Sequence, residues 1–387
     1  MDFALTAAQE AVRDNIARIC TRFDDAYWRN RDTDGRFPHE LYAAMAEGGW
    51  LGICMPEEYG GAGLGVTEAA IMMQAIAQSG AGMSGASAIH MNIFGLNPVV
   101  MFGTDDQKRR MLPPLIAGQE KACFGVTEPD AGLDTTAIKT HAERKGDHYV
   151  VHGQKIWTST AQVADRILLL ARTTPAGQGR RTEGLSLFYT ALDRNKVEVR
   201  HIDKMGRAAV DSNQVFFDGL EIPVEDRIGA EGQGFRNILH GMNPERVLIA
   251  AEAVGLGLCA LDRATRYAGE RRVFGRPIGQ NQAIQHPLAE SWMELEAARL
   301  MTMQAAWAYD TGREAGALAN TAKYLAAEAG FKACTQAVMT HGGMGYAKDF
   351  HVERYLRESI IPRIAPISRE LVLCYIAERV LGLPKSY

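Results

Sequence analysis

The feature that most constrains the fold of this chain is that its pattern of apolar residues changes twice. In residues 1–117 apolar side chains recur at helical spacing, and in residues 118–228 short runs of β-branched and aromatic residues are broken by Gly, Pro and Asp. In residues 229–387 long helical stretches rich in Ala, Leu, Met and Glu return. This order predicts an α+β protein with three domains: an N-terminal all-α domain, a middle β-barrel or sandwich domain and a C-terminal four-helix-bundle domain.

The composition excludes several classes of protein. With 47% hydrophobic residues among 387 positions, the chain can bury a large core. Its net charge is −4 and its basic residues are dispersed, so we expect no binding to nucleic acid or to a membrane surface. It has neither a signal-peptide pattern nor an apolar stretch of about 18 residues, and we expect it to be cytoplasmic. The six cysteines have no paired or metal-binding spacing, so we expect neither disulfide bonds nor a metal site.

Two glycine-rich segments fit nucleotide-binding motifs by spacing alone. The segment 255–260 (GLGLCA) matches the dinucleotide-binding pattern, but it lies inside a helical run with no strand before it. The segment 61–65 (GAGLG) also lacks a strand–helix–strand setting. We therefore expect close helix packing at the first segment and a loop at the second.

Four further motifs occur in order along the chain. They are Phe124 to Gly132 (FGVTEPDAG), Gly153 to Trp157 (GQKIW), Glu270 to Pro277 (ERRVFGRP) with Gln282 behind it, and His341 to Gly345 (HGGMG). Together they resemble the acyl-CoA dehydrogenase family, and the similarity runs nearly end to end. The resemblance implies FAD as cofactor, an acyl-CoA as substrate, and an electron-transfer flavoprotein as electron acceptor. It also implies a homotetramer built as a dimer of dimers.

The flavin ring needs an apolar face and a few fixed hydrogen-bond donors. Trp157 and the backbone amides near Val126 and Thr127 would supply both, and by resemblance Ser159 would hydrogen-bond near the flavin N5. The alternative interpretation is that Trp157 is an ordinary core residue of the β domain. The cofactor-binding set that the resemblance implies is Phe124, Val126, Thr127, Trp157, Ser159, Arg271, Phe274, Ile278, Gln282, Met339, Gly342, Gly343, Ser368 and Glu370.

Arg271 and Phe274 stand in the third motif. A guanidinium suits a pyrophosphate because it offers paired donors to phosphate oxygens, and Gly275 lets the backbone approach closely. In the family this arm reaches the flavin of the adjacent subunit, so oligomerisation would be part of cofactor binding. The alternative is a solvated arginine pair at a helix end.

The residue that decides the chemistry is the base. Oxidation of a saturated acyl thioester removes an α-proton and a β-hydride, and a carboxylate in a dry pocket is a suitable base. Most relatives keep this acid in a C-terminal loop, at the position of Pro366 here. Isovaleryl and long-chain types place it on the helix after the β domain, directly before an arginine, and Glu245-Arg246 is similar to that arrangement. The resemblance therefore implies Glu245 as the catalytic residue.

A structural role for Glu245 is the alternative. Acids are favoured in the first turn of a helix, and Asn243 as N-cap with Pro244 at the first helical position would explain its place. A first-turn role and a catalytic role are compatible, and loss of activity on substitution separates them.

Five residues would contact the substrate by resemblance: His90, Leu133, Met242, Arg246 and Pro366. His90 lies on a stretch of small residues that leaves room for a branched, cyclic or bulky acyl group. The alternative is a histidine whose hydrogen bonds are satisfied within the protein.

Two of these positions depart from the family pattern. Leu133 replaces a serine that often contacts the CoA arm, and Pro366 lacks the N–H that usually donates to the thioester oxygen. The predicted reaction is FAD-dependent dehydrogenation of an acyl-CoA to the 2-enoyl-CoA. Because of the two departures, an enoyl-CoA reductase, a desulfinase, a monooxygenase and a non-catalytic flavin-retaining protein stay open as alternatives.

Overall fold

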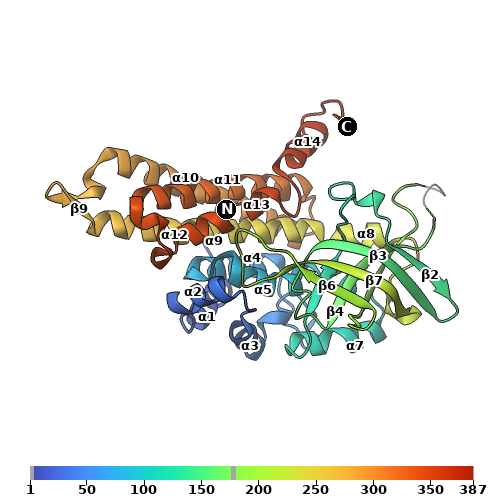
Figure 1. Cartoon of the computed structure of the whole chain (residues 1–387). Coiled ribbons are helices and arrows are strands. Elements are labelled where there is room, and N and C mark those ends of the chain that lie inside the picture. The colour runs from blue at the N-terminus through green and yellow to red at the C-terminus, as the bar shows by residue number, and fades with distance from the viewer. Residues whose placement is uncertain (1–3, 176–179, 387) are drawn as a thin grey trace.

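The computed structural model describes residues 4–175 and 180–386, which form a helical body with a sheet domain at one end (Figure 1). The N-terminal part is helical, because its apolar side chains recur every three to four residues. Most of those before residue 95 point into one core, and those from Leu96 to Ile116 point into a core shared with the sheet. Its helices are α1 (Ala7–Cys20), α2 (Asp25–Asp34), α3 (His39–Glu47), α4 (Val66–Ile76), α5 (Gly82–Phe94), α6 (Asn97–Phe102) and α7 (Asp105–Ile116).

A sharp kink separates α4 from α5. The connecting turn Ala77–Ala81 is π-helical, and Gly80 and Gly82 have φ angles of 103° and 63°. A Cβ atom at Gly82 would lie 2.5 Å from Oε2 of Glu358, so glycine is required there for space as well as for conformation. The kink sets the direction in which α5 leaves α4.

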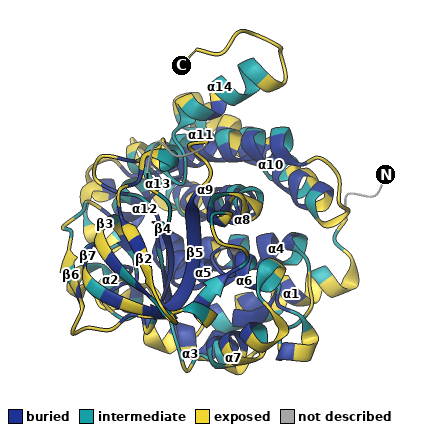
Figure 2. Ribbon diagram, turned by 90° about the vertical axis from the view of Figure 1, so that its right-hand side faces the viewer, coloured by how far each residue is buried: buried dark blue, intermediate teal, exposed yellow. Residues whose placement is uncertain are grey.

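The middle part is one eight-stranded sheet in the order β6-β7-β3-β2-β4-β5-β8, with β1 parallel to β4. Leu168 and Leu170 of β4 face a core shared with α7, whereas Ile167 and Leu169 face a second core. The central strands are therefore buried on both faces, as Figure 2 shows for β5. The strands are β1 (Ala122–Gly125), β2 (His141–Lys145), β3 (His148–Ser159), β4 (Arg166–Arg172), β5 (Leu185–Ala191), β6 (Val197–His201), β7 (Ser212–Pro223) and β8 (Arg227–Ile228).

The C-terminal part is again helical. Its elements are α8 (Gly234–His240), α9 (Met242–Glu270), the hairpin strands β9 (Arg272–Val273) and β10 (Arg276–Pro277), α10 (Gln282–Asp310), α11 (Gly316–His341), α12 (Val352–Glu358), α13 (Ile361–Ile364) and α14 (Arg369–Arg379). The three long helices α9, α10 and α11 pack on one another, and α4 of the N-terminal part packs against α9 and α10. The helix α14 projects from this body (Figure 2).

Close packing of α9 against neighbouring helices confirms the prediction for segment 255–260. A side chain at Gly255 would collide with the backbone oxygen of Gln74, and one at Gly257 would meet Leu295. Segment 255–260 is therefore a helix contact, and segment 61–65 is a loop before α4. The predicted order of helical, sheet and helical parts is also confirmed. Within the described residues, no helix is both long and apolar enough to cross a membrane.

Candidate active site

Glu245 lies in the first turn of α9 and is buried, with 6% of its surface exposed. The expectation that Asn243 caps this helix is wrong. Gly241 is the N-cap and no side chain caps the helix, because α8 ends at His240 and the chain passes through Gly241 in helical conformation. Pro244 is the third residue of α9 and not the first as expected, but it still fits there, since the first turn has no partner for its missing N–H.

The carboxylate of Glu245 contacts His90. The imidazole reaches from α5 so that Nε2 meets Oε2 of Glu245 while Nδ1 meets Oε1 of Glu252. Glu252 is fully buried and follows Glu245 by seven residues, about two turns, which puts both acids on one face of α9. His90 is itself 7% exposed, so the three groups form a buried Glu–His–Glu triad (Glu245, His90 and Glu252).

The charge of His90 follows from its neighbours. Burial alone disfavours the imidazolium, but the negative charges of Glu245 and Glu252 and their hydrogen bonds outweigh it and raise the pKa of His90 from 6.5 to about 10. His90 is therefore cationic at neutral pH. As the alternative interpretation expected, its ring nitrogens have partners within the protein, and one of the partners is the candidate base.

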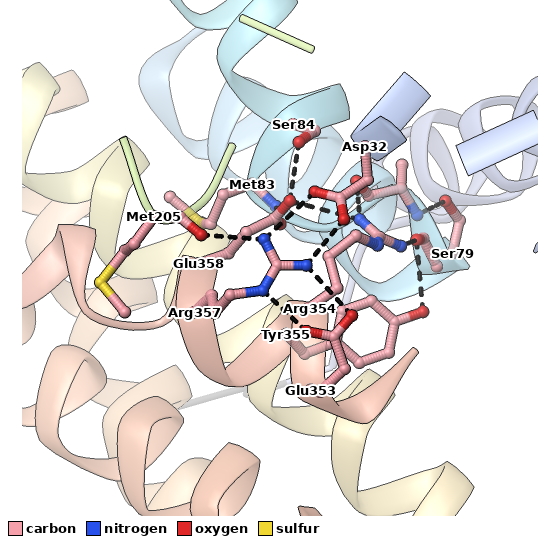
Figure 3. A network of polar contacts seen from close by, with 12 residues as sticks. Asp32, Ser79, Met83, Ser84, Met205, Glu353, Arg354, Tyr355, Arg357 and Glu358 are labelled. Atoms are coloured by element: carbon pink, nitrogen blue, oxygen red, sulfur yellow. Dashed lines mark hydrogen bonds and ion pairs between the residues drawn. The ribbon is translucent and has the colours of Figure 1, made fainter. Parts of the chain in front are cut away.

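The position of α5 is fixed by α12, as Figure 3 shows. Glu358 accepts hydrogen bonds from the backbone N–H of Met83 and the hydroxyl of Ser84, both at 2.7 Å. Arg354 donates to the backbone oxygen of Gly80 at 2.6 Å and pairs with Glu358 at 3.3 Å. These buried contacts hold the α4–α5 kink and so determine where α5 carries His90.

Arg207 connects the sheet domain to α5. It lies between β6 and β7 with a φ of 56° and donates hydrogen bonds to the hydroxyls of Ser87 (3.2 Å), Ser159 (3.0 Å) and Ser212 (3.4 Å). Its Nε has no hydrogen-bond partner although it is buried. Burial lowers the pKa of Arg207, and the negative charges of Glu252 and other nearby acids oppose this shift. Arg207 thus places a cation beside Ser159, one of the predicted flavin contacts.

The first group of predicted cofactor residues lies together on the sheet domain. Phe124 is on β1, and the chain beyond it pairs with β3, because the N–H of Ile156 donates to the oxygen of Thr127 at 2.9 Å. Trp157 and Ser159 follow on β3. Trp157 has a φ of 60° and is 57% exposed, so the interpretation of it as a core residue is wrong. Its large apolar ring is open to a planar partner such as a flavin.

The second group lies at the opposite end of α9. Arg271 comes 26 residues after Glu245, which is roughly 40 Å at about 1.5 Å per residue. The hairpin β9–β10 projects from the end of the helical body away from the sheet (Figure 1), and Phe274 at its turn is wholly exposed. Ile278 and Gln282 continue from this hairpin into α10.

Two more groups of predicted cofactor residues lie at the end of α11 and at the start of α14. Met339, Gly342 and Gly343 end α11 near the hairpin, as the stacked rings of His341 and Tyr267 show with centroids 4.3 Å apart. Ser368 caps α14 by accepting from the N–H of Leu371 at 3.2 Å, and Glu370 is exposed in its first turn.

The remaining predicted substrate residues are divided between two regions. Met242 and Arg246 lie in the first turn of α9, where Arg246 donates to the oxygen of Met242 at 3.2 Å. Pro366 lies between α13 and α14, and Lys323 donates to the oxygen of the next residue, Ile367, at 2.7 Å. Leu133 is exposed on a loop of the sheet domain.

The comparisons with known proteins cover the whole chain. Family models described as the N-terminal, middle and C-terminal domains of acyl-CoA dehydrogenase match residues 6–119, 123–220 and 232–381. Acyl-CoA dehydrogenase FadE12 of Mycobacterium tuberculosis is 37% identical over 390 residues, with 100% of this chain and 99% of the relative covered. The chain belongs to the acyl-CoA dehydrogenase family.

Two further similarities show the range of this acyl-CoA dehydrogenase family. The structure of a glutaryl-coenzyme A dehydrogenase in complex with glutaryl-CoA has a TM-score of 0.94 and 32% identity, covering 100% of this chain and 98% of that one. A 3-(aryl)acrylate reductase of Clostridium sporogenes is 33% identical over 351 residues, covering 90% of this chain and 92% of the relative.

Family membership confirms that the chain is an oxidoreductase and that FAD is its cofactor. The donor set fits FAD, since Trp157 exposes an apolar ring, Ser159 lies beside it along β3, and Arg271 exposes a guanidinium. Sequence reasoning missed Glu252 and Arg207. The spacing of seven between Glu245 and Glu252 was a usable signal, whereas no motif marked Arg207.

Proposed function

We propose that this acyl-CoA dehydrogenase family member removes the α-proton and β-hydride of an acyl-CoA to give the 2-enoyl-CoA, with Glu245 as the base. One observation carries the proposal: Glu245 is a buried carboxylate directly before Arg246, while the loop Ile364 to Ser368 contains no acid. A carboxylate kept from water is a stronger base toward a carbon acid than one in solvent.

Two tasks are assigned to residues of the chain: removal of the α-proton, and orientation of the helix turn that carries the base. Glu245 takes the proton from Cα, the C–H electron pair becomes the Cα–Cβ double bond, and the hydride leaves Cβ. FAD, when bound, supplies the hydride acceptor. Arg246 donates to the first turn of α9 and burial lowers its pKa, so we assign it to the orientation of this turn.

The thioester oxygen needs donors that stabilise its developing negative charge. Pro366 has no N–H, and we propose that the amide of Ile367 takes its place. Lys323 supports this assignment because it holds the oxygen of Ile367 at 2.7 Å and so limits rotation of this part of the loop.

We propose an electron-transfer flavoprotein as electron acceptor and a homotetramer, a dimer of dimers, as the assembly. The separation of roughly 40 Å between Glu245 and Arg271 along α9 supports exchange of the arm, since the hairpin lies far from the flavin residues of its own sheet domain. We place the enzyme in the cytoplasm.

The second candidate function is reduction of an unsaturated acid or thioester. The similarity to a 3-(aryl)acrylate reductase favours it, and so does the loss of the usual N–H at Pro366.

Anaerobic mixing of the oxidised enzyme with a panel of saturated acyl-CoAs tests both functions. The proposed function predicts bleaching of the flavin absorbance by at least one thioester and formation of its 2-enoyl-CoA. Reoxidation of the reduced enzyme by free 3-arylacrylates, without bleaching by any thioester, would support the reductase. An FAD-loaded enzyme inert in both assays would support a desulfinase, a monooxygenase or a non-catalytic role.

A further inference from the structure

We infer that His90 and Glu252 are positioning residues for the proposed base: His90 keeps Glu245 ionised in its buried site, and Glu252 keeps that ionised carboxylate strongly basic. The inference rests on the proposed role of Glu245 and concerns how its basicity is set. It is carried by the Glu–His–Glu triad, in which each ring nitrogen of one buried imidazole contacts a different buried carboxylate.

The two carboxylates have different surroundings. Glu245 lies at the start of α9 next to Arg246, whereas Glu252 lies two turns deeper and is fully buried. One oxygen of Glu252 has no hydrogen-bond partner. A group so far from solvent is poorly placed to touch substrate, so its effect on the reaction passes through His90.

The charges of the triad explain what each residue does. With both acids ionised and His90 cationic, the triad has a net charge of −1, and when Glu245 takes a proton the charge becomes zero. The charge of Glu252 repels the charge of Glu245 within this buried site, and a nearby like charge disfavours the ionised form of a carboxyl group. Glu252 thereby favours proton uptake by Glu245, while the cation of His90 prevents uptake from solvent before substrate arrives.

Each component is needed for this balance. Without the imidazolium, two buried carboxylates would share one site and at least one would bind a proton. Without Glu252, the imidazolium of His90 would pair with Glu245 alone. This stronger ion pair would stabilise the ionised carboxylate of Glu245 and make it a weaker base. The two changes therefore act on the base in opposite directions.

Other charged groups face the triad and stay the same in every variant. Arg207 approaches from the segment between β6 and β7, where Glu252, Glu358, Asp211 and Glu245 favour its charge. This cation moderates the repulsion between the two acids of the triad. It is held by serine hydroxyls, so substitutions within the triad leave its contacts in place.

Two further cations approach Glu245 itself. Arg246 lies next to it on α9, and Lys323 approaches from α11. Burial and Arg246 lower the pKa of Lys323 from 10.5 to about 8, so its charge changes in alkaline solution. The pH dependence of flavin reduction is therefore measured below pH 8, where Lys323 is mostly charged.

The test is the pH profile of flavin reduction by a saturating acyl-CoA in His90→Gln and Glu252→Gln. His90→Gln should move the acidic limb to higher pH by about one unit or more, because the base then shares a buried site with a second acid. Glu252→Gln should move it to lower pH and reduce the plateau rate by about tenfold, because the base becomes weaker. Asp262→Asn, an exposed change on the same helix, should leave the profile unchanged.

FAD content and the thermal midpoint show whether each variant is folded. If both triad variants retain FAD and their profiles coincide with wild type or move in the same direction, the inference is wrong. Failure of the proposed function looks different, since Glu245→Gln would then reduce its flavin at the wild-type rate. If either triad variant does not fold, His90→Asn and Glu252→Ser carry the same opposite expectations, and coinciding or parallel profiles in them would overturn the inference equally.

Discussion

The Glu–His–Glu triad and the β9–β10 hairpin lie at opposite ends of α9, and they differ in what surrounds them. The triad is buried, and both imidazole nitrogens contact side chains of the same chain. The hairpin exposes Arg271 and Phe274 to solvent. Both regions carry residues that the family resemblance assigns to the reaction. The difference supports the proposal that one chain completes its base, whereas its arm acts on another chain.

The largest expected effect concerns the buried end. Glu245→Gln keeps the size of the side chain and its burial but removes the carboxylate charge. Acyl-CoA should still bind, while flavin reduction falls by roughly a hundredfold or more, the scale of a lost general base. Anaerobic stopped-flow absorbance measures the rate and a titration measures binding. Wild-type reduction by this variant would remove Glu245 from the chemistry.

At the exposed end, Arg271→Ala should weaken FAD binding and leave folding nearly unchanged. A charge-assisted hydrogen bond contributes about 1.5 to 3 kcal/mol, which is about a 10-fold to 150-fold change in the dissociation constant of FAD. Arg272→Ala is the matched control, because this neighbour is also exposed and lies outside the predicted contact set. Equal FAD affinity in the two variants would place Arg271 among ordinary surface residues.

A pair of glycine substitutions compares the rigidity of the two regions. Gly82 and Gly275 both have positive φ angles, 63° and 79°, but only Gly82 has a neighbour in the way, at Glu358. Gly82→Ala should therefore lower the free energy of unfolding by about 1 to 3 kcal/mol more than Gly275→Ala does. Urea unfolding monitored by circular dichroism measures both values. Equal losses would mean that the kink can yield without strain.

The last prediction concerns the dependence of stability on pH. Because folding raises the pKa of His90 from 6.5 to about 10, its contribution is complete below pH 6.5 and is lost as pH rises towards 10. Relative to His90→Gln, the wild-type free energy of unfolding should fall between these values by at most about 1.4 kcal/mol per pH unit. A parallel pH dependence in both proteins would show that His90 does not carry the charge.

The sequence predicted the parts of the site that depend on order along the chain. The change in apolar spacing from helical to β and back to helical indicated the three-part fold. The position of Glu245 directly before Arg246 indicated the candidate base. The partners of that base come from tertiary packing. His90 lies 155 residues before Glu245, and Arg207 meets Ser87 and Ser159 only after the sheet has formed beside α5.

Local backbone conformation is a second reason why parts of the site could not be predicted from the sequence. The exposure of Trp157 depends on a positive φ within β3, which a tryptophan rarely adopts and no motif announces. Gly241 likewise capped α9 because α8 runs directly into it, although Asn243 is the better capping residue by type.

The length of α9 has a genetic consequence. In the proposed assembly, one helix carries the base of a subunit at its start and that subunit's arm at its end, so two chains that exchange arms would each complete the other's site. In a pair made from Glu245→Gln and Arg271→Ala chains, one site would receive both defects and the other would receive neither. Two impaired alleles of this gene, expressed together, should therefore restore full activity to half of the sites in every mixed pair.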